Sequence, residues 1–203
     1  DWGMEELLPI VMEVGEKNLK CMALLDKANK HMELRKEGKQ MMTIAQIMEK
    51  MIVFSEGNIH DITHLSCVWT YAKTIGELEG LDAETQFILE VAAITHDIAC
   101  PLCRKKYGNT NGSYQEQEGD PLVRAFLADT GMTAAQIDRV AYLVGHHHSP
   151  AQIDGIDYQI LIEADYIVNA SESGYSRQAI RTFMEHTMKT AAGIRLTKTV
   201  FGL

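Results

Sequence analysis

Apolar residues recur at intervals of three and four along most of the chain, and runs that alternate apolar with polar residues are nearly absent. Intervals of three and four place apolar side chains on one face of a helix, whereas a half-buried strand requires alternation. The pattern therefore predicts an all-α protein of roughly eight helices. They are expected near residues 5–34, 40–54, 61–80, 82–97, 122–127, 133–148, 160–170 and 177–190.

Capping and helix-breaking residues mark several of these boundaries. Asp82 and Asp157 precede apolar runs as candidate N-caps, and residues 133–136 read Thr-Ala-Ala-Gln, the pattern of a capping box. Pro101 is expected to end the fourth helix, because proline disrupts a helix interior. Residues 107–119 are rich in Gly, Asn and Ser, which predicts a long loop. Long loops in compact domains are usually functional or disordered.

Length and composition fit one compact domain. The chain has 203 residues, of which 46% are hydrophobic and 23% are charged, and this is enough for one sizeable core. Residues 58–203 are expected to form the main helical domain, and residues 1–57 an N-terminal pair of helices rich in Met and Lys. Methionine at helical spacing is ordinary core filler, so we expect this pair to pack on the core. A dimer surface is the alternative, which leaves a homodimer open.

The charge balance argues against polyanionic partners. The formal net charge is -9, whereas nucleic-acid polymers and anionic membranes bind cationic surfaces. Four cysteines do not make a disulfide framework in a chain of this length, and the N-terminus lacks the pattern of a secretory signal. No stretch approaches the roughly 18 apolar residues of a membrane span. We therefore expect a cytoplasmic protein that acts on small molecules.

Histidine and aspartate residues interrupt apolar helix faces at four places. His64 lies four residues before Val68, so its imidazole is expected to face inward with the apolar side chains. His96 and Asp97 directly follow the apolar run at residues 91–95, where the helix opens into a loop. The side chains of His96 and Asp97 are both able to point into a cleft.

The other two interruptions lie further along the chain. His147 and His148 lie three and four residues after the apolar Val144, and Asp165 lies in the apolar stretch at residues 160–170. A single histidine or aspartate on an apolar face is more often a hydrogen-bonded core group. Four such places in one all-α chain favour a divalent metal site, because a cation compensates buried imidazole and carboxylate groups.

The order and helical setting of these residues resemble the HD-domain superfamily of metal-dependent phosphohydrolases, an all-α family with the pattern H…HD…D. The matching segments read HDITHLSCV at 60–68, AAITHDI at 92–98 and ILIEADYI at 160–167, within a resemblance that covers residues 58–172. The resemblance implies an HD-domain helical core. It also implies that His64, His96, Asp97 and Asp165 bind a divalent metal ion, with His96 and Asp97 in the catalytic centre.

The resemblance leaves the number of metal ions open. Relatives with two ions have further histidines; His147 and His148 match one pair of them, and Asp97 would then bridge the ions. Another histidine is expected before Gly119, where this chain has a run of Gln and Glu. Either Glu116 supplies an oxygen ligand there or the second ion is absent. The expected cofactor is one or two divalent ions, with Fe, Mn, Ni, Co and Zn not distinguished.

The resemblance implies that metal-activated water cleaves a phosphate ester of a nucleotide or a small phosphorylated metabolite. Arg104, Lys105 and Lys106 follow the HD pair and are the candidate residues for binding the substrate phosphate. Two alternatives remain. One is a di-iron oxygenase on the same scaffold, which requires the full set of binuclear ligands. The other is a non-catalytic sensor or interaction module that has kept the fold.

Overall fold

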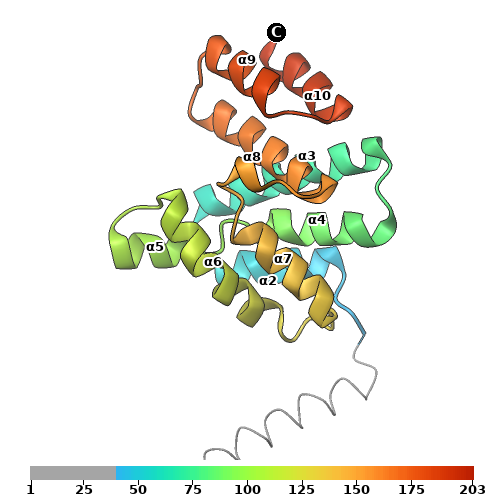
Figure 1. The fold of residues 1–203 in the computed structure, drawn as a ribbon. Coiled ribbons are helices and arrows are strands. Elements are labelled where there is room, and N and C mark those ends of the chain that lie inside the picture. The colour runs from blue at the N-terminus through green and yellow to red at the C-terminus, as the bar shows by residue number, and fades with distance from the viewer. Residues whose placement is uncertain (1–39) are drawn as a thin grey trace, which may run out of the picture. The chain divides into compact units, whose positions relative to one another are not determined.

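Nine α-helices and one short 3₁₀ helix make up residues 40–203, which contain no strand (Figure 1). The computed structural model describes these residues, and the predicted helix at residues 5–34 lies outside them. The prediction of an all-α protein is confirmed. The elements are α2 (Ile44–Phe54), α3 (Ile59–Glu79), α4 (Ala83–Thr95), α5 (Cys100–Tyr107), α6 (Gly112–Leu127), α7 (Ala134–Val144), η1 (Pro150–Gln152), α8 (Ile156–Glu172), α9 (Arg177–His186) and α10 (Ala191–Phe201).

Side-chain caps explain where several helices begin. Thr43 caps α2 and Thr133 caps α7, each in a capping box with the glutamine three residues later. Asp82 caps α4 by accepting hydrogen bonds from the backbone N–H groups of Glu84 and Thr85. The predicted caps of α4 and α7 are therefore confirmed.

Four predictions about helix ends are wrong. Pro101 does not close a helix but lies in the first turn of α5, where its missing N–H costs nothing. The long loop predicted at 107–119 shrinks to residues 108–111 between α5 and α6. Asp157 lies inside the first turn of α8 and accepts hydrogen bonds from Arg139 instead of capping the helix. The expected last helix is followed by a further one, α10.

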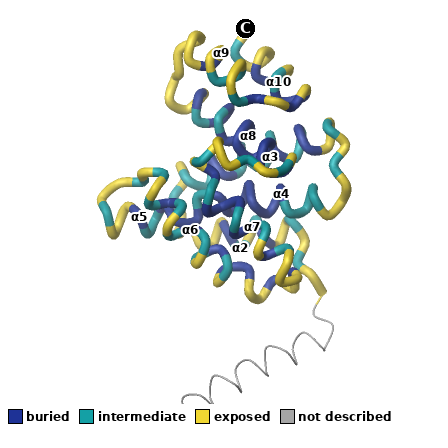
Figure 2. Tube along the Cα trace, viewed as in Figure 1, coloured by how far each residue is buried: buried dark blue, intermediate teal, exposed yellow. Residues whose placement is uncertain are grey.

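Helices α3, α4 and α8 form the centre of the domain. Helix α3 packs against both α4 and α8, and α4 also contacts α2, α7 and α8. The C-terminal half of α4 and most of α8 are buried, as the dark tube in Figure 2 shows. Polar side chains on these segments are therefore shielded from water, which makes each of them costly unless it has a partner.

The chain divides into two compact units, Asp1–Met41 and Met42–Leu203. The sequence assigned residues 42–57 to the N-terminal segment, whereas α2 lies in the second unit and contacts α4. The first helix of the predicted N-terminal pair lies outside the described part of the chain, so its packing or dimerisation stays a prediction.

Among residues 40–203, one helical stretch, Ala83–Tyr107, has the length and apolar composition of a membrane span, although no such stretch was expected from the sequence. Its most apolar window is 67% buried inside the protein, as in the core helix of a globular domain. The stretch is thus weak evidence for a membrane, and the cytoplasmic location stays a prediction.

Candidate metal centre

Three ligand atoms from three helices meet in the core. The Nε2 atom of His64, on α3, lies 3.2 Å from Nε2 of His96, which caps the C-terminus of α4. It also lies 3.2 Å from Oδ1 of Asp165, on α8, and the distance from His96 Nε2 to the same oxygen is 3.5 Å. All three residues are buried. We call His64, His96 and Asp165 the inner group.

Neighbouring oxygens fix the orientation of both inner imidazoles. The Nδ1 atom of His64 lies 3.0 Å from Oε2 of Glu172, and Nδ1 of His96 lies 2.8 Å from the backbone carbonyl of Ala93. Because Nδ1 donates to these oxygens, Nε2 is the nitrogen that each ring would present to a metal ion. This is the arrangement that histidine ligands of metal ions usually have.

A second set of three ligand atoms lies beside the first. It consists of Asp97, which follows α4, and of His147 and His148, which follow α7; its ligand atoms lie within 4.8 Å of one another. We call these residues the outer group. The Nδ1 atom of His147 donates to the carbonyl of Val144 at 2.8 Å. Its Nε2 atom is buried and has no hydrogen-bond partner among residues 40–203, although it lies 3.4 Å from Oδ1 of Asp97. Such an orphaned buried nitrogen requires an explanation, and a metal ligand is one.

Asp97 lies between the two groups. Its Oδ2 is 3.7 Å from Nε2 of His64, and its Oδ1 is 3.6 Å from Nε2 of His96 and 3.4 Å from Nε2 of His147. Within the described residues, the ion-pair partners of Asp97 and Asp165 are all imidazoles. A buried carboxylate and a partly buried one, with no lysine or arginine partner in this part of the chain, favour a bound cation.

The pKa values of these groups reflect the same imbalance of charge. Burial opposes protonation of His64, but its contact with Asp165 and the charge of Asp97 outweigh burial and raise its pKa to about 9. Burial also disfavours charge on Asp97 and Asp165, yet the surrounding imidazoles hold both pKa values well below the usual range. His148 differs, because loss of water around its ring and the neighbouring His147 lower its pKa to about 4. The centre thus holds its carboxylates ionised.

Comparison with known proteins supports one architecture. The chain matches no family model and no curated relative. Among solved structures, it is similar to a predicted HD superfamily hydrolase from an uncultured Thermotogales bacterium, with a TM-score of 0.58 and 20% sequence identity. The match covers 78% of this chain and 84% of the other. The chain has an HD-domain fold. At this identity, the similarity shows the fold and leaves the activity to be argued from the site.

A cavity of about 350 Å³ lies against the candidate metal centre, and its wall includes His64, Asp97, His148 and Asp165. Of the three basic residues predicted to bind phosphate, Arg104 alone contributes to this wall, where it forms an ion pair with Asp61. The other two do not line the cavity. Lys105 lines a different surface depression, and Lys106 pairs with Glu118 at 2.7 Å.

Glu116, predicted as an alternative oxygen ligand, lies outside both groups. Its Oε1 accepts a hydrogen bond from the backbone N–H of His148 at 3.2 Å. The cavity wall holds its neighbour Gln115 instead, whose side chain contacts Cys100 and the carbonyl of Thr110. Glu116 therefore positions the turn that carries the outer histidines, and its predicted role as a ligand has no support in the geometry.

The HD domain also contains site residues that the sequence analysis missed. Asn169 and Glu172 lie four and seven residues after Asp165 on α8; Asn169 donates to Oδ1 of Asp165 at 2.8 Å, and Glu172 contacts His64. The spacing of four and seven would have identified both residues, because it places them on the face of α8 that carries Asp165. Tyr158, seven residues before Asp165, is buried. Its hydroxyl lies 2.9 Å from the carbonyl of Ser149 and also contacts that of His146, so it holds both ends of the histidine turn.

Proposed function

We propose that this HD domain is a metal-dependent phosphohydrolase that cleaves a phosphate ester of a small molecule. The observation that carries the proposal is the position of Asp97, within 3.7 Å of His64 and in contact with His147 of the outer group. One carboxylate thus serves two adjacent sets of metal-ligand atoms. Paired ligand sets that share a carboxylate suit a centre that acts on phosphoryl oxygens.

The donor atoms fit a divalent transition metal. Each group combines imidazole nitrogens with a carboxylate oxygen, a mixture that suits Zn, Mn, Fe, Ni or Co. The imidazoles of His64, His96 and His147 have an oxygen partner at Nδ1, so each presents Nε2 to the centre. The inner group would hold the first ion, and the outer group would hold a second.

A bound divalent cation would polarise a phosphoryl oxygen and lower the pKa of water, which makes water a nucleophile near neutral pH. Asp97 has a lowered pKa and therefore stays ionised, so its carboxylate is able to accept a hydrogen bond from the attacking water and orient it. Arg104, on the wall of the same cavity, carries the positive charge that a phosphoryl oxygen requires during its transfer. Glu172 keeps the His64 imidazole in the orientation that exposes Nε2.

Metal content and phosphate release test this proposal together. The full chain, purified without added metal, should contain a transition metal, and loaded protein should release inorganic phosphate from small phosphate esters. The His96→Ala variant should lose both properties, because it removes an inner ligand. His186→Ala is the matched control: His186 is exposed on α9 and its ring contacts the carbonyl of Thr182, away from both ligand groups, so this variant should keep both.

Two outcomes would overturn the proposal. Folded protein that binds no transition metal would indicate a non-catalytic module. Loaded protein that consumes oxygen and releases no phosphate would indicate the oxygenase that shares this scaffold.

A further inference from the structure

The cavity wall carries far more negative than positive charge. Four carboxylates line it, and the guanidinium of Arg104 is the one lysine or arginine group among the lining residues. Two of the carboxylates, Asp97 and Asp165, belong to the metal centre. The other two, Asp61 and Glu172, lie outside the two ligand groups. Substrate therefore meets one fixed cation and two fixed anions besides the proposed metal ions.

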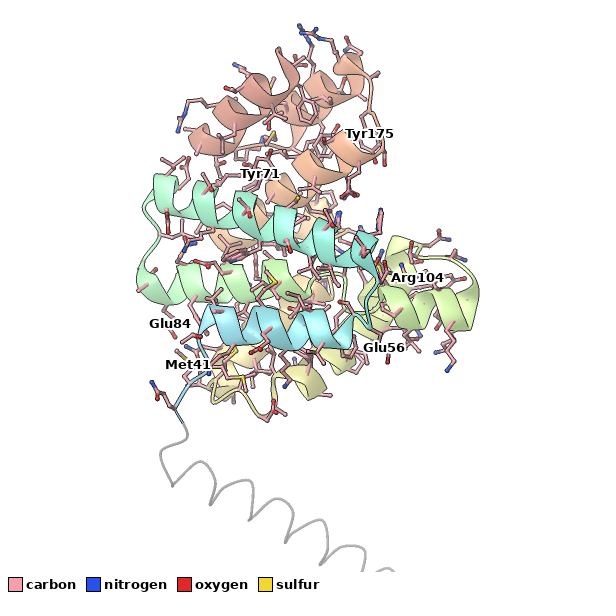
Figure 3. The ribbon with its side chains drawn as sticks, turned by 180° about the vertical axis from the view of Figure 1, so that it is seen from behind. Met41, Glu56, Tyr71, Glu84, Arg104 and Tyr175 are labelled. Atoms are coloured by element: carbon pink, nitrogen blue, oxygen red, sulfur yellow. The ribbon has the colours of Figure 1, made fainter. Side chains whose placement is uncertain are left out.

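The cation is not isolated, because Arg104 is paired with Asp61. The side chain of Asp61 is only 13% exposed and also accepts a hydrogen bond from the amide of Asn58 at 3.1 Å. Asp61 lies in the first turn of α3 and Arg104 lies on α5, so the pair joins two helices at the cavity. Figure 3 shows Arg104 on the same side of the domain as Tyr175, another residue of the wall.

This charge distribution bears on the number of phosphates that the cavity could hold. One phosphoryl group would be neutralised by the metal centre together with Arg104. A second phosphate would need further cations, which proteins usually supply as additional lysines, arginines or Mg²⁺. The lining residues include no further lysine or arginine, and the carboxylates of Asp61 and Glu172 belong to the wall that a second phosphate would meet. Such juxtaposed like charges oppose binding.

The size and the remaining wall residues restrict the organic part of the substrate. The volume of about 350 Å³ is small among ligand cavities, which typically span about 300–1,000 Å³. Beyond the charged residues, hydroxyl and amide groups of Thr110, Gln115, Asn169 and Tyr175 contribute to the wall. Groups of this kind suit an organic part that forms hydrogen bonds.

We infer that the cavity takes a phosphomonoester with a compact, polar organic part, and that the Asp61–Arg104 pair selects against a second phosphate. This inference rests on the proposed phosphohydrolase function. It names a substrate class and assigns Asp61 a role in specificity that is separate from metal binding.

Rates of phosphate release from matched substrates test the inference. With the metal-loaded full chain, kcat/KM for adenosine monophosphate should exceed that for adenosine diphosphate by about tenfold or more, because of the added like charge. Glycerol 3-phosphate should be a better substrate than phenyl phosphate, whose organic part is apolar. A diphosphate cleaved as well as the monophosphate, or a preference for phenyl phosphate, would overturn the corresponding part of the inference.

Substitutions of Arg104 and Asp61 separate the roles of the two residues of the ion pair. Arg104→Ala should lower kcat/KM for the monophosphate about 10- to 100-fold, because it removes a hydrogen bond between two charged groups. Lys105→Ala is the matched control, since Lys105 lies outside the cavity wall, and it should leave kcat/KM unchanged. Asp61→Asn should reduce the preference for monophosphate over diphosphate, whereas an unchanged preference would show that Asp61 has no part in selection.

Product binding distinguishes failure of the inference from failure of the proposed function. If no substrate releases phosphate, the proposed function is wrong. Calorimetric titration of the metal-loaded protein with inorganic phosphate and with pyrophosphate still tests the selectivity of the cavity. Tighter binding of phosphate supports the inference, and tighter binding of pyrophosphate contradicts it.

Discussion

The inner and outer groups contain the same kinds of donor atom but differ in how the fold holds them. The inner residues His64 and Asp165 lie within long helices, and His96 is the C-cap of α4; all three are buried. The outer residues follow the ends of α4 and α7, and their burial ranges from buried for His147 to exposed for His148. The two groups thus differ in rigidity of support rather than in chemistry.

The inner and outer groups also differ in the hydrogen bonds that orient their ligands. Every inner ligand has a partner that fixes its orientation, whereas no hydrogen bond is made by the ring of His148 within the described residues. Its position depends instead on the turn, which Glu116 and Tyr158 hold through backbone groups. Ligands that are oriented in advance bind a metal more tightly, so we expect the inner group to fill before the outer group.

The largest expected effect comes from removing one ligand of each group in turn. His64→Ala should weaken binding of the first ion by more than about 100-fold, since even the loss of a supporting partner costs about 10- to 100-fold. His148→Ala should leave binding of that ion nearly unchanged and abolish binding of the second. Metal analysis after equilibrium dialysis measures both. Equal losses in the two variants would show that the groups act as one site.

The next largest effect is expected from pH, because protons compete with metal ions for the inner group but not for His148 of the outer group. The pKa of His64 in the metal-free protein is about 9, above its ordinary value of 6.5, so His64 is protonated at pH 7 and an inner ion must displace that proton. Inner affinity should therefore rise about tenfold per pH unit up to about pH 9. His148, with a pKa of about 4, is neutral at pH 7 and releases no proton. Calorimetry in buffers of different ionisation enthalpy counts the protons that are released when metal binds. If the first ion binds at pH 7 without releasing a proton, this account is wrong.

A smaller effect is expected when the partner of an inner ligand is weakened. Glu172→Gln replaces the carboxylate that holds Nδ1 of His64, and it should reduce inner affinity by about 10- to 100-fold. The control is Glu185→Gln, an exposed glutamate on α9, which should have no effect. If the two variants bind metal equally well, Glu172 does not orient the ligand.

The smallest effect is expected at the turn. Tyr158→Phe removes the hydroxyl that contacts the carbonyls of His146 and Ser149, at a cost of about 1 kcal/mol in stability. It should weaken binding of the second ion several-fold and leave binding of the first ion unchanged. Tyr166→Phe, which loses a hydrogen bond at the exposed end of α9, serves as the control. If Tyr158→Phe also weakens binding of the first ion, the substitution has loosened the whole core.

The sequence was sufficient to predict the inner group because helix periodicity determines which side chains face inward. His64 and Asp165 lie in line with apolar neighbours, and the structure buries both. The structure places Arg104 on the cavity wall and Lys105 and Lys106 away from it, for a physical reason. Their direction depends on α5, a helix that was missed because Pro101 was interpreted as a terminator, whereas it occupies a first turn.

The long loop was mispredicted for a related reason. Residues 112–119 combine glycine with glutamine and glutamate. Glutamine and glutamate favour helix, and packing of α6 against α7 stabilises the helix there. The contacts that hold the histidine turn were beyond sequence reasoning altogether. Tyr158 and Glu116 act through backbone atoms of distant residues, and no spacing rule indicates such contacts.

The most direct test of the account is a crystal structure of the protein loaded with Mn²⁺, with anomalous scattering used to locate the ions. The account predicts a strong peak among His64, His96, Asp97 and Asp165, and a weaker peak beside His147 and His148 that strengthens with metal concentration. Loaded crystals with no peak at the inner group, or with a peak at the outer group alone, would contradict it.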